Sequence, residues 1–212
     1  MAILIFDLDG TLINTASIVV DAYHRVLTDF SYDKAALPNE EQVLKTFGLP
    51  DTEIWRQLMP KHTPAQQMNG FEQASGRIQK DMAVQDILLP HAKEVLIELH
   101  ARGHVLTTGS NCNQAYLDVV MTTQGIGHLF DRPLCLESVS GQEKADILRT
   151  LKARYEPDGD LYMIGDRYTD AEAARKVHIP FVACDFGFGD PSELAGATHK
   201  IQSLPELLAL FQ

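Results

Sequence analysis

The sequence predicts an α/β protein in which helices cover both faces of a parallel sheet and a helical insertion follows the first strand. Two observations support this prediction. After residue 86, short apolar runs alternate with segments of helical periodicity. A separate apolar run stands at residues 3–6, and no convincing strand pattern lies between the two regions. Strands that alternate with helices are typical of parallel sheets, because each helix carries the chain back to the edge where the next strand begins.

The first apolar run, from Ile3 to Phe6, predicts a buried strand that stops at Asp7. Gly10 then allows a sharp turn. Asp7 and Asp9 are separated by one residue, so on an extended chain they point to the same side and repel each other unless a cation or a shared proton lies between them. Taken alone, such a pair is more often an Asp-rich turn that caps a strand.

The segment from residue 15 to residue 85 shows only helical patterns. Residues 15–29 carry apolar side chains at helical spacing, with Thr15 or Ser17 as the candidate N-cap. Prolines and glycines divide the remainder: Pro38, Gly48, Pro50, Pro60, Pro64 and Gly70. We therefore expect an inserted helical subdomain at residues 15–85, and a core formed by residues 1–14 and 86–212.

The core elements follow in alternation. The expected helices cover residues 91–102, 114–124, 143–154, 171–177 and 205–211. The expected strands after the first cover residues 105–108, 133–136, 161–164 and 180–184. This order predicts a parallel sheet with both faces covered.

Composition limits the classes of function. The chain has 212 residues, of which 45% are apolar, and its formal net charge is −11 without any basic run. We therefore expect neither nucleic acid nor an anionic membrane as a partner. No apolar run is long enough for a membrane span, and no basic segment precedes the first strand, so we expect a cytoplasmic protein. An odd number of widely spaced cysteines, Cys112, Cys135 and Cys184, predicts free thiols.

Polar residues follow three of the predicted strands where each strand ends: Asp7 and Asp9, Thr108 and Ser110, and Asp166 and Asp170. In a parallel sheet these ends meet at one edge, where ligands bind. Four carboxylates without enough cations require a divalent metal, and oxygen ligands without histidine or cysteine favour Mg²⁺ over zinc. Asp170 alone would also be explained as a helix N-cap.

The same edge is suited to phosphate. Thr108 and Ser110, together with backbone N–H groups freed by Gly109 at a helix start, can hold phosphate oxygens. Lys144 is the natural counter-charge for a carboxylate and a phosphoryl group brought close together. A lone lysine at a helix start is more often solvated, so its role depends on its position between the motifs. Mg²⁺ held by few carboxylates and by substrate phosphate is the usual arrangement for phosphoryl transfer.

The order of these motifs resembles the haloacid dehalogenase superfamily of phosphatases. A D-x-D-G-T motif, a strand ending in threonine, a lone lysine and a G-D-x-x-x-D motif extend from Asp7 to Asp170, and the tail at residues 186–194 is also similar. The helical insertion resembles the α-helical cap of the subgroup that contains phosphoglycolate phosphatase and β-phosphoglucomutase. The resemblance implies a Rossmann-like core with an inserted cap.

The resemblance also implies residue roles. Asp7 would be the nucleophile that forms an aspartyl-phosphate, and Asp9 would be the general acid and base. Asp7, the backbone carbonyl of Asp9, and Asp166 would bind Mg²⁺. Asp170 would ligate the ion through water or orient Lys144.

For the phosphate, the resemblance implies Thr108, the Gly109 backbone and Lys144. Thr107 is a weaker candidate than Thr108, since Thr108 adjoins the glycine. The sequence departs from the family pattern at Asn14 and at residues 142–143, where many relatives have a Gly-Lys-Pro run around the lysine.

We therefore expect a Mg²⁺-dependent phosphatase that acts on a small phosphorylated metabolite, as a monomer or small homo-oligomer. Asp9 argues against dehalogenation, which has no use for an acid at that position. A phosphomutase of the same superfamily and a non-catalytic phosphate-binding module remain alternatives. Nothing in residues 15–85 specifies the leaving group.

Overall fold

The computed structural model describes residues 1–47, 49–156, 158–188 and 190–212. Gly48, expected to separate two helices, and Gly189, part of the tail that resembles the family, lie outside the described residues. The chain divides into two compact units. The core unit comprises Met1–Asn14 and Ile87–Gln212, and the helical unit comprises Thr15–Asp86. Within the described ranges, no helix has both the length and the apolar character that crossing a membrane requires.

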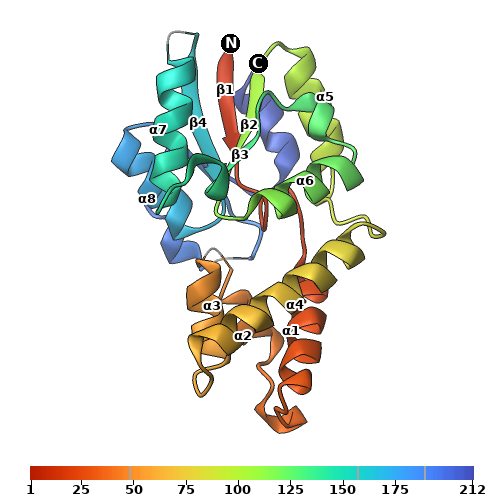
Figure 1. The fold of residues 1–212 in the computed structure, drawn as a ribbon. Coiled ribbons are helices and arrows are strands. Elements are labelled where there is room, and N and C mark those ends of the chain that lie inside the picture. Colours follow the sequence, from red (N-terminus) through yellow and green to blue (C-terminus); the bar gives the residue numbers. More distant parts are fainter. Residues whose placement is uncertain (48, 157, 189) are drawn as a thin grey trace. The chain divides into compact units, whose positions relative to one another are not determined.

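The core unit contains a six-stranded sheet in the order β3-β2-β1-β4-β5-β6, and every neighbouring pair is parallel (Figure 1). The strands are β1 (Ala2–Phe6), β2 (Val105–Ser110), β3 (Leu134–Cys135), β4 (Asp160–Gly165), β5 (Phe181–Cys184) and β6 (His199–Ile201). The direction in which strands are added reverses between β1 and β4. In open parallel sheets, ligands bind beyond the carboxyl ends of the strands at such a switch point.

Two strand predictions need correction. Strand β6 was missed, because its sequence His-Lys-Ile has one buried apolar residue and the strand lies at the sheet edge. Strand β2 continues two residues beyond the expected end at Thr108, because Gly109 and Ser110 pair with β3. Ser110 therefore belongs to the strand and not to the turn after it.

Helices lie on both sides of the sheet, with α7 and α8 on one side and α5 and α6 on the other (Figure 1). The core helices are α5 (Ala92–Ala101), α6 (Gln114–Thr123), α7 (Lys144–Tyr155), α8 (Tyr168–Val177) and α9 (Leu207–Leu210). Helix α8 begins three residues before the expected start at Ala171. The reason is a local cap, since the Asp170 carboxylate accepts a hydrogen bond from the backbone N–H of Arg167 at 3.0 Å.

Alternation along β1 determines which face each side chain meets. Ile3 and Ile5 are fully buried in a cluster with apolar residues of α7 and α8. Phe6 points to the other face and meets Phe130 edge-on, with ring centroids 6.3 Å apart. Because the period is two, Asp7 follows Ile3 and Ile5 onto the face of α7 and α8. The backbone N–H of Asp7 continues the hydrogen-bond ladder between β1 and β4 by donating to the Ile164 carbonyl at 2.9 Å.

The helical unit contains α1 (Ala16–Asp29), α2 (Glu40–Leu44), α3 (Asp51–Leu58) and α4 (Pro64–Met82). Trp55 is 2% exposed and forms the centre of its packing. The indole meets Tyr23 of α1 edge-on at 5.2 Å, and a Cβ placed on Gly70 of α4 would lie 2.8 Å from it. Asn39 and Thr63 cap α2 and α4 with their side chains.

Short 3-10 turns complete the connections. They are η1 (Lys34–Ala36), η2 (Gly127–Leu129), η3 (Glu137–Val139), η4 (Pro191–Leu194) and η5 (Leu204–Glu206). The last of these covers Leu204–Glu206, so only Leu207–Leu210 of the helix expected at residues 205–211 are α-helical.

Candidate active site

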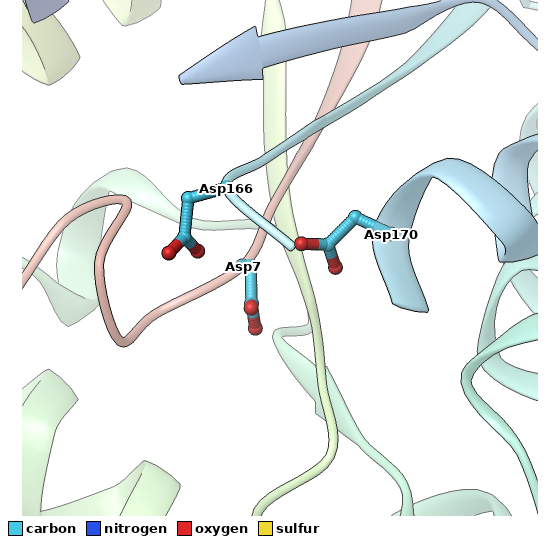
Figure 2. Close-up of side chains that lie close together, drawn as sticks. All are labelled: Asp7, Asp166 and Asp170. Atoms are coloured by element: carbon cyan, nitrogen blue, oxygen red, sulfur yellow. The ribbon is translucent and has the colours of Figure 1, made fainter. Parts of the chain in front are cut away.

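Three aspartates converge at the carboxyl edge of the sheet. Asp7, Asp166 and Asp170 each offer a carboxylate oxygen, and these oxygens all lie within 4.8 Å of one another (Figure 2). The side chains come from the end of β1, the end of β4 and the first turn of α8. They are buried, with 6%, 2% and 0% exposed. The structure thus brings Asp7 together with two acids that lie more than 150 residues further along the sequence, at the switch point of the sheet.

Lys144 is the cation of this carboxylate cluster. Its Nζ atom lies 3.0 Å from Oδ2 of Asp7 and also contacts Oδ1 of Asp170. The side chain is 3% exposed, so Lys144 is not a solvated lysine at a helix start. Burial opposes the ammonium form, but the carboxylates of Asp170 and Asp7 outweigh it and raise the pKa of Lys144 above its usual value.

The single positive charge of Lys144 does not balance the negative charges of the three buried carboxylates. Burial, together with the charges of Asp170 and Asp7, raises the pKa of Asp166 well above its usual value. Burial also raises the pKa of Asp170, to about 6, although Lys144 opposes the shift. Among the described residues, neither histidine nor cysteine joins this group. Three buried oxygen donors with one lysine therefore fit a hard divalent cation such as Mg²⁺.

Two glycines leave the room that the carboxylates occupy. Gly10 has φ +75, and a Cβ placed there would lie 2.2 Å from Oδ2 of Asp166. A Cβ on Gly165 would lie 2.3 Å from the carboxyl carbon of Asp170. Thr11 also holds this region, because its hydroxyl donates to Oδ1 of Asp166 at 3.3 Å. Sequence reasoning gave Thr11 no role, although it belongs to the D-x-D-G-T motif.

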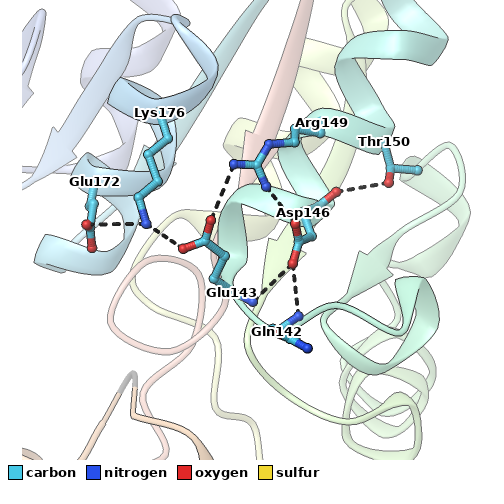
Figure 3. Close-up of polar contacts among 7 residues, drawn as sticks. All are labelled: Gln142, Glu143, Asp146, Arg149, Thr150, Glu172 and Lys176. Carbon is cyan, nitrogen blue, oxygen red and sulfur yellow. Dashed lines mark hydrogen bonds and ion pairs between the residues drawn. The ribbon is translucent and has the colours of Figure 1, made fainter.

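The residues before Lys144 hold the start of α7 in place. Asp146 accepts hydrogen bonds from the backbone N–H groups of Gln142 at 2.9 Å and Glu143 at 3.2 Å (Figure 3). The Glu143 carboxylate contacts Lys176 of α8. The segment that departs from the family pattern thus caps α7 and connects it to α8, with Lys144 directed into the carboxylate cluster.

The Asp9 carboxylate has a different partner. Its oxygens Oδ1 and Oδ2 accept from the hydroxyl of Tyr116 at 2.8 Å and 3.0 Å, and it does not belong to the group of three aspartates. Sequence reasoning missed Tyr116, because a tyrosine in the first turn of a helix carries no functional signal of its own. Only the contact identifies it.

Three of the predicted phosphate-binding residues, Thr108, Gly109 and Ser110, end β2, beside β1. The register pairs Thr108 with Phe6, so Gly109 is level with Asp7 at the sheet edge. The Thr108 hydroxyl donates to the Leu134 carbonyl at 2.8 Å, and the Thr107 hydroxyl donates to a main-chain carbonyl in the same way. Ser110 is buried and 4% exposed. The structure therefore places this segment next to β1, with both threonine hydroxyls bonded to the main chain.

Comparison with known proteins defines the class. A family model described as haloacid dehalogenase-like hydrolase matches residues 4–184. The chain belongs to this family and is an enzyme of the hydrolase class, as its motifs indicated. It is 26% identical over 202 residues to a phosphoglycolate phosphatase of Synechococcus elongatus, with 93% of this chain and 90% of that protein covered. It is 24% identical over 213 residues to the pyrophosphatase PpaX of Listeria innocua, with 98% and 94% covered.

A solved structure confirms the fold class. The crystal structure of a predicted phosphoglycolate phosphatase from Haemophilus somnus matches with a TM-score of 0.89 at 20% identity, covering 99% of this chain and 97% of that chain. The expected Rossmann-like α/β fold is therefore correct.

Proposed function

We propose that the protein is a Mg²⁺-dependent phosphatase that hydrolyses a small phosphorylated metabolite through an aspartyl-phosphate on Asp7. The observation that carries this proposal is the buried Asp7 carboxylate beside Lys144, Asp166 and Asp170 at the switch point. A carboxylate in such a setting can attack phosphorus, because nearby positive charge compensates the charge of the phosphoryl oxygens. The relatives named as a phosphatase and a pyrophosphatase support a reaction at phosphorus.

The carboxylate cluster is the place for the metal. Asp7, Asp166 and the backbone carbonyl of Asp9 would hold Mg²⁺, with Asp170 acting through water or through Lys144. The contact between Asp170 and Lys144 supports the second of these roles for Asp170. When bound, Mg²⁺ supplies charge neutralisation for the phosphoryl oxygens.

In the first half of the reaction, a carboxylate oxygen of Asp7 forms a bond to phosphorus while the bond from phosphorus to the leaving oxygen breaks. Asp9 donates a proton to that leaving oxygen. In the second half, Asp9 removes a proton from a water molecule that attacks the phosphorus, and inorganic phosphate leaves as the Asp7 carboxylate is restored. Lys144 keeps a positive charge beside Asp7 throughout.

The remaining assignments concern the substrate. Thr108, Gly109 and Ser110 would hold phosphate oxygens from the end of β2 through hydroxyl and backbone N–H groups. The helical unit would act as a cap that limits the site to small leaving groups. We therefore propose a small phosphorylated metabolite as the substrate.

The test is a panel of p-nitrophenyl phosphate, small phosphate esters including phosphoglycolate, and pyrophosphate, each with Mg²⁺ and with EDTA. We expect release of inorganic phosphate that EDTA abolishes and added Mg²⁺ restores. A rapid quench with labelled substrate should place the label on Asp7. Transfer of the phosphoryl group to another hydroxyl without release of phosphate would identify a mutase instead. Binding of phosphate without turnover of any panel member would identify a binding module.

A further inference from the structure

Tyr116 bonds to the residue that would move the proton. The Tyr116 hydroxyl lies 2.8 Å from Oδ1 and 3.0 Å from Oδ2 of Asp9, so one phenol spans both carboxylate oxygens. The two residues are 107 positions apart in the sequence, and both are partly buried. A contact of this kind restricts rotation of the Asp9 side chain, which is short and follows a strand end.

The backbone that carries Asp9 is held firmly. Backbone N–H groups of Thr11, Leu12 and Ile13 all donate to the Leu8 carbonyl, at 3.1, 2.8 and 3.0 Å. This tight turn fixes the position of the Asp9 backbone. The direction of its carboxyl group then depends on the contacts that its side chain makes.

The backbone that carries Tyr116 is held as well. The side chain of Asn113 accepts from the Tyr116 N–H at 2.9 Å, which caps α6. The Glu137 carboxylate accepts from the backbone N–H of Gln114 at 2.6 Å. Two separate side chains therefore fix the first turn of α6, from which the phenol reaches Asp9.

We propose that Tyr116 is a positioning residue that aims the Asp9 carboxyl group during proton transfer. This inference rests on the proposed function. The phenol O–H can donate to an unprotonated carboxyl oxygen of Asp9 whether Asp9 is a carboxylic acid or a carboxylate, so one partner can hold Asp9 both before and after it gives up its proton, and the acid's own O–H stays available for the leaving oxygen. Proton transfer needs the donor within hydrogen-bond reach of the leaving oxygen, and a rotating carboxyl group meets this condition less often.

The test is Tyr116→Phe, which removes the hydroxyl and keeps the ring. The measured quantity is kcat/KM for an alkyl phosphate and for p-nitrophenyl phosphate, because it reports the step in which the leaving group departs. An alkoxide leaves poorly without a proton, whereas p-nitrophenolate is stable as an anion. We expect a loss of about tenfold or more for the alkyl ester and of less than about threefold for the aryl ester.

Tyr155→Phe is the matched control. The Tyr155 hydroxyl also donates to a carboxylate, Oδ2 of Asp131 at 2.6 Å. Tyr155 is the last residue of α7, at the opposite end of that helix from Lys144 and the carboxylate cluster. Its replacement should change kcat/KM of both esters by the same factor. In an Asp9→Asn background, Tyr116→Phe should have no further effect on the alkyl ester, because the proton donor that it aims is gone.

Equal losses for both esters, or no loss for either, would overturn the role of Tyr116. So would an Asp9→Asn background in which Tyr116→Phe still selectively slows the alkyl ester. Turnover of p-nitrophenyl phosphate by the wild type tests the proposed function separately, because the role of Tyr116 is read only from the ratio of the two losses. The affinity for trifluoroberyllate, a mimic of the phosphoryl group, should stay within about twofold in Tyr116→Phe and so separates lost positioning from a damaged site.

Discussion

The Nζ atom of Lys144, at the start of α7, lies 3.0 Å from Oδ2 of Asp7, at the end of β1, and both side chains are buried. The same ammonium contacts Asp170 at the start of α8. One lysine therefore links three elements of the core unit. The proposed nucleophile and its counter-charge are in place before any substrate arrives, which is the form of preorganisation that stabilises developing charge.

Lys144→Ala should strongly destabilise the metal-free protein, because it leaves three buried carboxylates without their cation. We expect a loss of about 3 kcal/mol or more in the free energy of unfolding, measured by urea denaturation in EDTA. Phosphate and trifluoroberyllate should also bind at least about tenfold more weakly by calorimetry. Lys152→Ala is the control, since Lys152 lies on the same helix outside the carboxylate cluster, where it donates to the Val177 carbonyl at 3.0 Å and pairs with Glu156 at 3.7 Å. A similar loss of stability in both variants would contradict the role of the buried lysine.

Asp7→Asn should abolish turnover and leave the fold intact, because an amide has nearly the same shape as a carboxylate and is a poor nucleophile. Activity on p-nitrophenyl phosphate and circular dichroism measure the two effects. A variant that keeps substantial activity, or a wild-type phosphoryl label found on another residue, would show that Asp7 is not the nucleophile.

Asp166→Asn should make the metal-free protein more stable and less responsive to Mg²⁺. Burial and the charges of Asp170 and Asp7 disfavour the charged form of Asp166, so removing that charge relieves repulsion. We expect a gain of about 1 kcal/mol in EDTA. Wild-type protein should gain about 2.7 kcal/mol when Mg²⁺ is present at 100 times its dissociation constant, and the variant should gain much less at the same concentration. If Mg²⁺ stabilises both proteins equally in thermal unfolding, Asp166 is not a ligand.

Gly10→Ala should damage the metal site beyond the cost of backbone strain. Gly10 has φ +75, and its added Cβ would meet Asp166 at 2.2 Å. Gly103 is the matched control because it has φ +83 and nothing lies within 4 Å of its added Cβ. Gly103→Ala should cost about 1 kcal/mol in the free energy of unfolding, whereas Gly10→Ala should cost more and also weaken Mg²⁺ binding. Equal costs with unchanged Mg²⁺ affinity would refute the close approach.

Deletion of residues 15–86 should change substrate preference. The backbone N–H of Asn14 donates to the Ile87 carbonyl at 2.8 Å, so a short Gly-Ser linker can join the two ends of the core unit. If the helical unit acts as a cap, its loss should lower kcat/KM for small esters far more than for a bulky phosphopeptide. An equal loss for both in a folded variant, or a preference of the intact enzyme for phosphopeptides over every small ester tested, would rule out the cap.

The class of fold, and the edge of the sheet at which polar residues gather, could both be derived from the sequence alone. Apolar runs such as residues 3–6 and 161–164 are local patterns, and a strand's burial is encoded in the residues that form it. Asp7 directly follows the first run and Asp166 follows the second after Gly165, so their place at a strand end could be derived without coordinates. The order of these motifs was also specific enough to indicate the family.

Which of these residues meet, and what holds them, depends on long-range packing and is visible only in the folded chain. Three contacts each join segments more than 100 residues apart: Lys144 with Asp7, Tyr116 with Asp9, and Gly10 with Asp166. Strand order decided the contacts of Tyr116 and Asp166, because β1 lies between β2 and β4 and so brings the segments after those two strands to the segment that follows β1. Local periodicity contains no information on strand order, and it missed β6 because an edge strand needs few apolar residues. Contacts made by packing across the sheet therefore had to be observed.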